Sequence, residues 1–233
     1  MRIIKNVKLK IDEDEVLRYL GYSKNKVVKS KEIILQVYKE EIERAYNLFQ
    51  PQGIYASFKI NKIFFSEREI NLENGFPLYF HNSAIHFLEG ADYLILGVVT
   101  IGNSLEDKTS EFFAHNEYSR ALALDAVGTV AIRYLGQHVR NIICQEVKEQ
   151  HLQTTKFFSP GTTEWGISQQ KNIFEIIPAD KIGVRLTDSY MMIPKKSLSW
   201  AIGIGENIIT FSKEDDSCQI CQAINCQFRK DFN

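Results

Sequence analysis

The feature that most constrains the fold is an apolar run near the middle of the chain. Residues 91–102, ADYLILGVVTIG, carry no charge after Asp92 and are rich in β-branched side chains. The length of the run and the glycine that closes it favour a strand buried on both faces rather than a helix. The run therefore predicts the central strand of a sheet.

The rest of the chain alternates between strand-like and helix-like stretches, with no internal repeat or long linker. We expect strands where apolar and polar residues alternate, and helices where apolar residues recur at spacings of three and four. The predicted strands are 1–11, 54–66, 76–80, 182–194 and 197–205, and the predicted helices are 12–21, 31–49, 83–90, 104–114, 116–150 and 167–177. The order of these elements is not a regular β-α-β alternation, which indicates an α+β fold with a mostly antiparallel sheet.

Composition limits the classes of partner. The chain has 233 residues, 44% of them hydrophobic, and a formal net charge of -1, so no overall field favours nucleic acid or an anionic membrane. No stretch approaches the roughly 18 uninterrupted apolar residues of a membrane span, and the N-terminus does not resemble a signal peptide. We therefore expect a cytoplasmic protein with one domain over residues 1–213 and a cysteine-bearing tail over 214–233.

Three of the four cysteines lie close together in that tail. Cys218, Cys221 and Cys226 form a C-x-x-C-x-x-x-x-C pattern, in which thiolates can converge on a soft metal ion or an iron–sulfur cluster. A fourth ligand would have to come from Cys144, a histidine, water or another chain. The alternative is a reactive tail whose cysteines have no specific role.

The stretch FFSPGTTEW, residues 157–165, combines a strong turn signal with aromatic side chains on both sides. Pro160 and Gly161 predict a turn, and a glycine lets a ligand approach the backbone closely. Phe157, Phe158 and Trp165 could offer stacking faces or cation–π partners to that ligand. The alternative is a tight turn whose aromatic side chains pack in the core.

Motifs for common catalytic sites are missing from the sequence. There is no G-x-S-x-G, no P-loop and no G-x-G-x-x-G before a helix. The five histidines show no metal-ligand spacing. We therefore predict no catalytic residue.

Several stretches in order resemble one protein family, and together they cover nearly the whole chain. They are EVLRYLGY, GADYLILGVVTIG, ALALDAVGTVA, FFSPGTTEW followed by Gln169-Gln170, IGVRLTDSYMMIPKKSLSWAIGIG and the CQICQAINCQFR tail. This series is similar to the S-adenosylmethionine-binding activation domain of cobalamin-dependent methionine synthase, and most of all to its short, free-standing bacterial relatives.

The resemblance implies a curved α+β domain with a twisted, mostly antiparallel sheet flanked by helices. It also implies a function: binding S-adenosylmethionine and docking on a separate cobalamin-binding methyltransferase or corrinoid protein, whose cob(II)alamin is reduced by one electron and methylated. The electron donor would be a flavodoxin-like or ferredoxin-like protein. An alternative is a corrinoid-protein docking module without methyl-donor chemistry, which would relay electrons through a metal or iron–sulfur site on the tail.

The resemblance also indicates which residues would contact S-adenosylmethionine. In the family the turn reads Arg-x-Ala/Ser-Pro-Gly-Tyr; here the Arg position is Phe157, with Lys156 beside it, and the Tyr position is Thr162. An acidic position late in the long helix falls on Gln137. The implied cofactor-binding set is Lys156, Phe157, Phe158, Ser159, Pro160, Gly161, Thr162, Trp165 and Gln137.

Overall fold

The computed structural model describes residues 1–22, 31–162 and 164–208. Within this part, the chain divides into two compact units. The sheet unit consists of residues 1–9, 50–103 and 132–208, and the helical unit consists of residues 10–49 and 104–131. The prediction of a single domain over 1–213 with a separate tail remains a prediction, because 209–233 lie outside the described residues.

The sheet unit is built on one antiparallel sheet, as the sequence predicted. Its path is β4-β3-β2-β5-β9-β6, and β1 pairs with β2 beside this path. The strands are β1 (Arg2–Lys5), β2 (Gln52–Phe64), β3 (Glu69–Leu72), β4 (Pro77–Tyr79), β5 (Tyr93–Thr100), β6 (Gln153–Thr154) and β9 (Ser197–Gly205). The apolar run forms β5, buried along its length after Tyr93 between its antiparallel neighbours β2 and β9.

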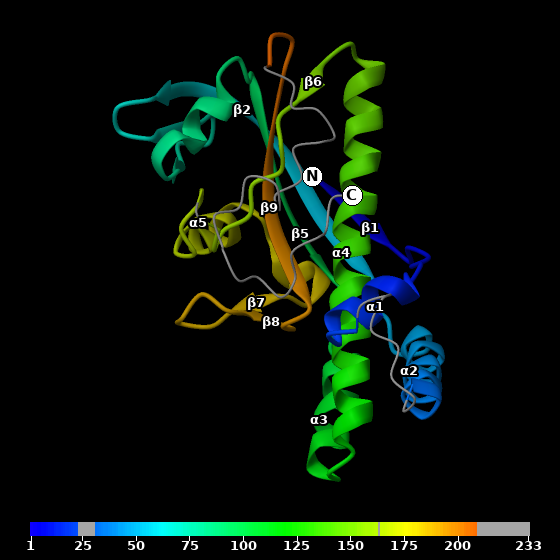
Figure 1. Cartoon of the computed structure of the whole chain (residues 1–233). Helices are drawn as coiled ribbons and strands as arrows, with labels where there is room; N and C mark the ends of the chain where they lie inside the picture. The colour runs from blue at the N-terminus through cyan, green and yellow to red at the C-terminus, as the bar shows by residue number, and fades with distance from the viewer. Residues whose placement is uncertain (23–30, 163, 209–233) are drawn as a thin grey trace. The chain divides into compact units, whose positions relative to one another are not determined.

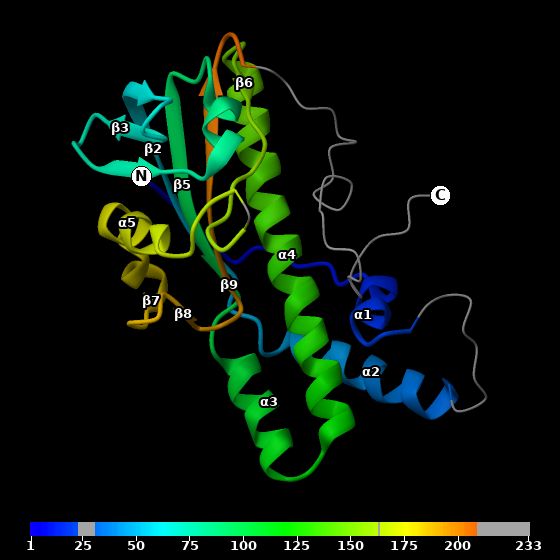
Figure 2. The same cartoon turned by 60° about the vertical axis from the view of Figure 1, so that its left-hand side comes forward.

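Helices of the sheet unit cover both faces of this sheet (Figures 1 and 2). The later part of α4 (Tyr118–Glu149) lies on one face. The opposite face carries η1 (Asn82–Leu88), α5 (Gln169–Ile176) and η2 (Ala179–Ile182). There the main hydrophobic core joins strand residues such as Leu96 to Ile173 of α5. The twisted, mostly antiparallel sheet flanked by helices is therefore confirmed.

The helical unit contains α1 (Glu13–Tyr19), α2 (Lys31–Tyr46), α3 (Ser104–Ala114) and the first part of α4. Asp12 caps α1, accepting hydrogen bonds from the backbone N–H groups of Asp14 and Glu15, which fits the acidic start seen in the sequence. The long helix α4 is thus shared, since residues 118–131 belong to this unit and 132–149 to the sheet unit.

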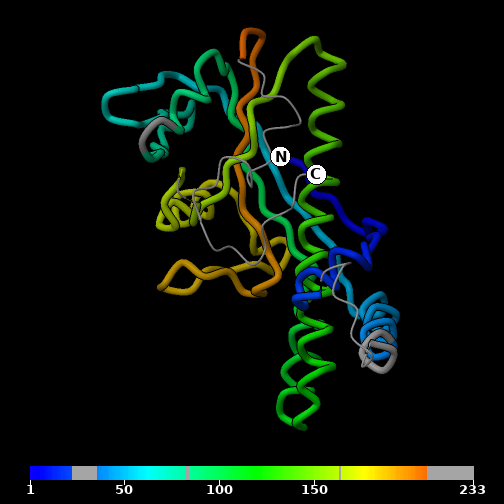
Figure 3. The backbone as a smooth tube through the Cα atoms, viewed as in Figure 1, coloured from blue at the N-terminus to red at the C-terminus, as the bar shows by residue number. Residues whose placement is uncertain are grey.

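One predicted strand is wrong, and another is too long, because only Arg2–Lys5 of the predicted strand 1–11 form β1. Residues 182–194 do not form a single strand; they form the end of η2 and a separate hairpin of β7 (Arg185–Leu186) and β8 (Met192–Ile193). The cause is a turn at 187–191, where the Thr187 hydroxyl accepts a hydrogen bond from the Met191 N–H and Tyr190 adopts a φ of 62°. Figure 3 shows this hairpin projecting away from β9. The short strands β3 and β6 lie outside the predicted set.

Candidate functional site: the 156–165 turn and the facing part of α4

The Pro160-Gly161 turn is closed by its own hydrogen bonds. The Gly161 N–H donates to the Trp165 carbonyl at 2.8 Å, and the Thr162 hydroxyl donates to the Ser159 carbonyl at 2.9 Å. Gly161 has a φ of 90°, a conformation that favours glycine. Pro160 and Ser159 are half-buried, while Gly161 and Thr162 are exposed. The predicted turn therefore forms, with its tip at the surface.

Two of the three aromatic side chains in this stretch lie in the core. Phe158 and Trp165 are fully buried. Phe158 exchanges backbone hydrogen bonds with Ala201 of β9, and the Trp165 ring stacks on Phe80 with centroids 4.7 Å apart. Neither ring presents a face to solvent. Their contribution to the turn is to hold it against the sheet.

Phe157 points to the other face of the sheet. Its ring stacks on Trp200 of β9 at a centroid distance of 4.7 Å, and the guanidinium carbon of Arg140 lies 5.4 Å from the Phe157 centroid. Trp200 fits because its register partner on β5 is Gly97, where an added Cβ would come within 2.3 Å of the tryptophan ring. We call Arg140, Phe157 and Trp200 the Phe157 stack.

Lys156 points back toward the core side of the turn. Its ammonium lies 3.9 Å from the Phe87 centroid and 5.6 Å from that of Phe158, and it forms an ion pair with Glu164. The lysine side chain is only 14% exposed. The charge nearest to the turn is therefore already neutralised by a residue of the turn.

Gln137 lies on α4, three residues before Arg140, with an exposed side chain. Its amide nitrogen donates to the Asn141 side-chain oxygen at 2.8 Å. Farther along the helix, the Cys144 sulfur lies 3.7 Å from the Thr154 hydroxyl of β6. This part of α4 thus runs beside the segment that leads into the turn. Sequence reasoning missed Arg140 and Trp200, because no local signal separates them from other helix and strand residues.

Comparison with known proteins identifies this architecture. No protein-family model and no curated protein matches the sequence significantly. Among solved structures, the MetH reactivation domain bound to AdoHcy matches with a TM-score of 0.68 over 87% of this chain and 77% of that chain, at 14% sequence identity. The chain has the reactivation-domain fold. The resemblance inferred from the order of the sequence motifs is thereby confirmed at the level of the fold.

The predicted metal site on the cysteine tail is not tested by the structure. Cys218, Cys221 and Cys226 lie outside the described residues. Within the described ranges, no group of three or more histidine, cysteine or acidic side chains could hold a metal ion. Cys144 is a half-buried free thiol. The described helices also include none long and apolar enough to cross a bilayer.

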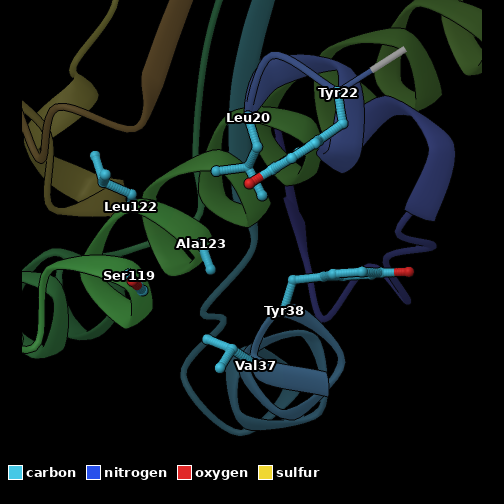
Figure 4. A pocket seen from close by; sticks show the side chains of 7 residues that line it. All are labelled: Leu20, Tyr22, Val37, Tyr38, Ser119, Leu122 and Ala123. Atoms are coloured by element: carbon cyan, nitrogen blue, oxygen red, sulfur yellow. The ribbon is translucent and has the colours of Figure 1, made fainter. Parts of the chain in front are cut away.

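The helical unit of this reactivation-domain fold contains a cavity of its own (Figure 4). It has a volume of about 210 Å³, and its lining is mostly apolar. The lining residues are Leu20, Tyr22, Val37, Tyr38, Ser119, Leu122 and Ala123. Ligand pockets for drug-sized molecules typically measure about 300–1,000 Å³. The volume of this cavity lies below that range.

Proposed function

We propose that this chain is a cytoplasmic reactivation partner of a cobalamin-dependent methyltransferase of the methionine synthase type. It would bind S-adenosylmethionine at the 156–165 turn and the facing part of α4. The observation that carries the proposal is the fold match to a MetH reactivation domain that holds AdoHcy. AdoHcy is what S-adenosylmethionine becomes after it gives up its methyl group.

The chemistry asks little of the protein beyond positioning. In the proposed role, a flavodoxin-like or ferredoxin-like protein would reduce the partner's cob(II)alamin by one electron, and the resulting cob(I)alamin would take the methyl group of bound S-adenosylmethionine, leaving S-adenosylhomocysteine. The chain therefore has to hold the sulfonium in line with the partner and exclude water. This transfer requires no general acid or base.

The residues at the turn fit such a ligand. Gly161 is exposed and has no side chain to obstruct an approaching nucleoside. The Phe157 ring, in the same stretch of chain, is held between Trp200 and the Arg140 guanidinium. On α4, the Gln137 side-chain oxygen can accept a hydrogen bond from the ligand's ammonium group, since its amide nitrogen is the atom bonded to Asn141.

A second function, docking on a corrinoid protein without methyl-donor chemistry, is favoured by one observation. The polar groups nearest to the turn tip are engaged within the protein: Lys156 pairs with Glu164, and the Thr162 hydroxyl bonds to the Ser159 carbonyl. In that case, electrons from a flavodoxin-like or ferredoxin-like donor would pass through a metal or cluster on Cys218, Cys221 and Cys226.

Calorimetric titration of the whole chain with S-adenosylmethionine and S-adenosylhomocysteine separates the two functions. The first function predicts saturable binding of both ligands at one site. An intact fold by circular dichroism with no heat of binding at millimolar ligand would refute it. An anaerobic visible spectrum and metal analysis test the second function, and a colourless, metal-free protein would remove the redox relay.

A further inference from the structure

The turn has a nearby cation that the described residues do not neutralise. Arg140 projects from α4 over the Phe157 ring. Among the described residues, salt bridges to carboxylates are made by Arg2, Arg18, Arg44 and Arg120, whereas Arg140 makes none. Lys156, the other cation at the turn, is already paired with Glu164.

The geometry of the Phe157 stack prepares this guanidinium for a ligand. The guanidinium carbon of Arg140 lies 5.4 Å from the Phe157 centroid, within the range of a cation–π contact, and no hydrogen bond or salt bridge of the described residues engages its N–H groups. Those N–H groups match the two oxygens of a carboxylate and can bind both at once. The ring beneath is fixed from its other side by Trp200, which packs against Gly97 with no space to spare. The side chain therefore loses little rotational freedom when a ligand binds.

We propose that Arg140 binds the α-carboxylate of an adenosyl amino acid held at the 156–165 turn. The proposal rests on the proposed function. It places the carboxylate-binding arginine on α4, whereas the turn itself carries Phe157 as the platform for that arginine. The ligand class comes from the proposed function, and Arg140 supplies a cation that suits the carboxylate of that ligand.

Two ligands separate the carboxylate contact from the rest of the site. S-Adenosylhomocysteine carries the carboxylate, and 5′-methylthioadenosine keeps the nucleoside and the sulfur but lacks the amino acid. Both are titrated into the wild-type chain, Arg140→Ala, Arg140→Lys and the control Lys148→Ala. Lys148 is an exposed cation on the same helix, so its loss removes the same charge away from the stack. Circular dichroism verifies the fold of each variant.

The expected result is specific to one ligand. Arg140→Ala weakens S-adenosylhomocysteine binding about 10- to 100-fold, as expected for loss of hydrogen bonds to a charged group. It leaves 5′-methylthioadenosine binding unchanged. The affinity of Arg140→Lys for S-adenosylhomocysteine lies between those of the wild type and Arg140→Ala, because lysine restores the charge without the bidentate geometry of the guanidinium. Lys148→Ala binds both ligands like the wild type.

Three outcomes would overturn the proposal. If Arg140→Ala weakens the binding of both ligands equally, Arg140 contacts the nucleoside or supports the fold and does not bind the carboxylate. If that variant binds S-adenosylhomocysteine as tightly as the wild type, Arg140 does not bind the carboxylate, and the proposed function is unaffected. No binding of either ligand by the wild type removes the proposed function and this proposal together. Should the alanine variant not fold, Arg140→Gln, which keeps the length of the side chain, takes its place in the same comparison.

Discussion

At the scale of single residues, the candidate site depends on a glycine, which leaves space for a neighbouring ring. Gly97 on β5 lies opposite Trp200 on β9, and an added Cβ would come 2.3 Å from the tryptophan Cζ2 atom. No real Cβ tolerates that distance, so either the ring or the strand would have to move. Since Trp200 supports the Phe157 ring, its displacement also disturbs the surface on which Arg140 rests.

We predict that Gly97→Ala destabilises the protein by about 1–3 kcal/mol, the usual cost of overpacking a core. It should also weaken S-adenosylhomocysteine binding, because the Phe157 stack loses its support. Denaturant unfolding and calorimetry measure the two effects. The matched control is Gly136→Ala on α4, where an added Cβ meets only Leu198 Cδ1 at 3.4 Å. A Gly97→Ala chain as stable as the wild type would contradict the packing argument.

The turn glycine gives a second prediction at this scale. Gly161 has a φ of 90°, so Gly161→Ala should cost about 1–2 kcal/mol of stability. Gly183 has a φ of 73° with open space around it, and Gly183→Ala should cost a similar amount. Only Gly161→Ala should weaken S-adenosylhomocysteine binding in calorimetry. Equal binding by the two variants would remove the turn from the site.

At the scale of elements, a buried carboxylate joins the helices of the helical unit. Glu41 of α2 is fully buried and accepts hydrogen bonds from Arg44 at 2.9 Å and from Arg120 of α4 at 2.8 Å. The Arg120 guanidinium also lies 4.4 Å from the ring centroid of Phe112 on α3. This cluster therefore joins α2, which contributes Glu41 and Arg44, to Phe112 of α3 and Arg120 of α4.

We predict that Arg120→Met destabilises the chain by about 2 kcal/mol, because it leaves the Glu41 carboxylate buried with a single cationic partner. Adding Glu41→Leu to that variant should recover much of the loss, since the unpaired buried charge is then gone. Thermal unfolding of the two variants and the wild type tests this. A double variant less stable than Arg120→Met would show that the carboxylate is still favourable without Arg120.

Elements whose signals are local could be predicted from the sequence, and those built from distant contacts could not. The apolar run predicted β5, because a strand that is buried on both faces needs a continuous apolar sequence. The hairpin of β7 and β8 was missed because its turn-forming residues Thr187, Asp188 and Ser189 lie between apolar residues that suggest one continuous strand. Pro160 and Gly161 predicted the turn. The Phe157 stack was not predictable, because strand pairing and α4 bring its three members from separate parts of the chain.

At the scale of the whole molecule, both tryptophans of the chain, Trp165 and Trp200, lie in the sheet unit. Helices, in contrast, occur in both units. Tryptophan fluorescence therefore reports on the unit that contains the candidate site, and far-ultraviolet circular dichroism reports on both.

We predict that S-adenosylhomocysteine raises the unfolding midpoint measured by tryptophan fluorescence. A ligand at 100 times its dissociation constant stabilises the native state by about 2.7 kcal/mol. If the two units unfold independently, the part of the circular dichroism transition that comes from the helical unit should keep its midpoint when the ligand is added. A fluorescence midpoint that does not move at saturating ligand would place the binding site elsewhere or show that no site exists.

Phe157 and Phe158 are neighbours in the sequence, yet one packs on Trp200 and the other in the core beside Ala201. Side chains alternate between faces along extended backbone, so a shift by one position exchanges them. Deletion or insertion of a single residue between Thr154 and Phe157 would put the wrong ring on each side. The length of this short segment therefore decides which of the two rings packs on each side.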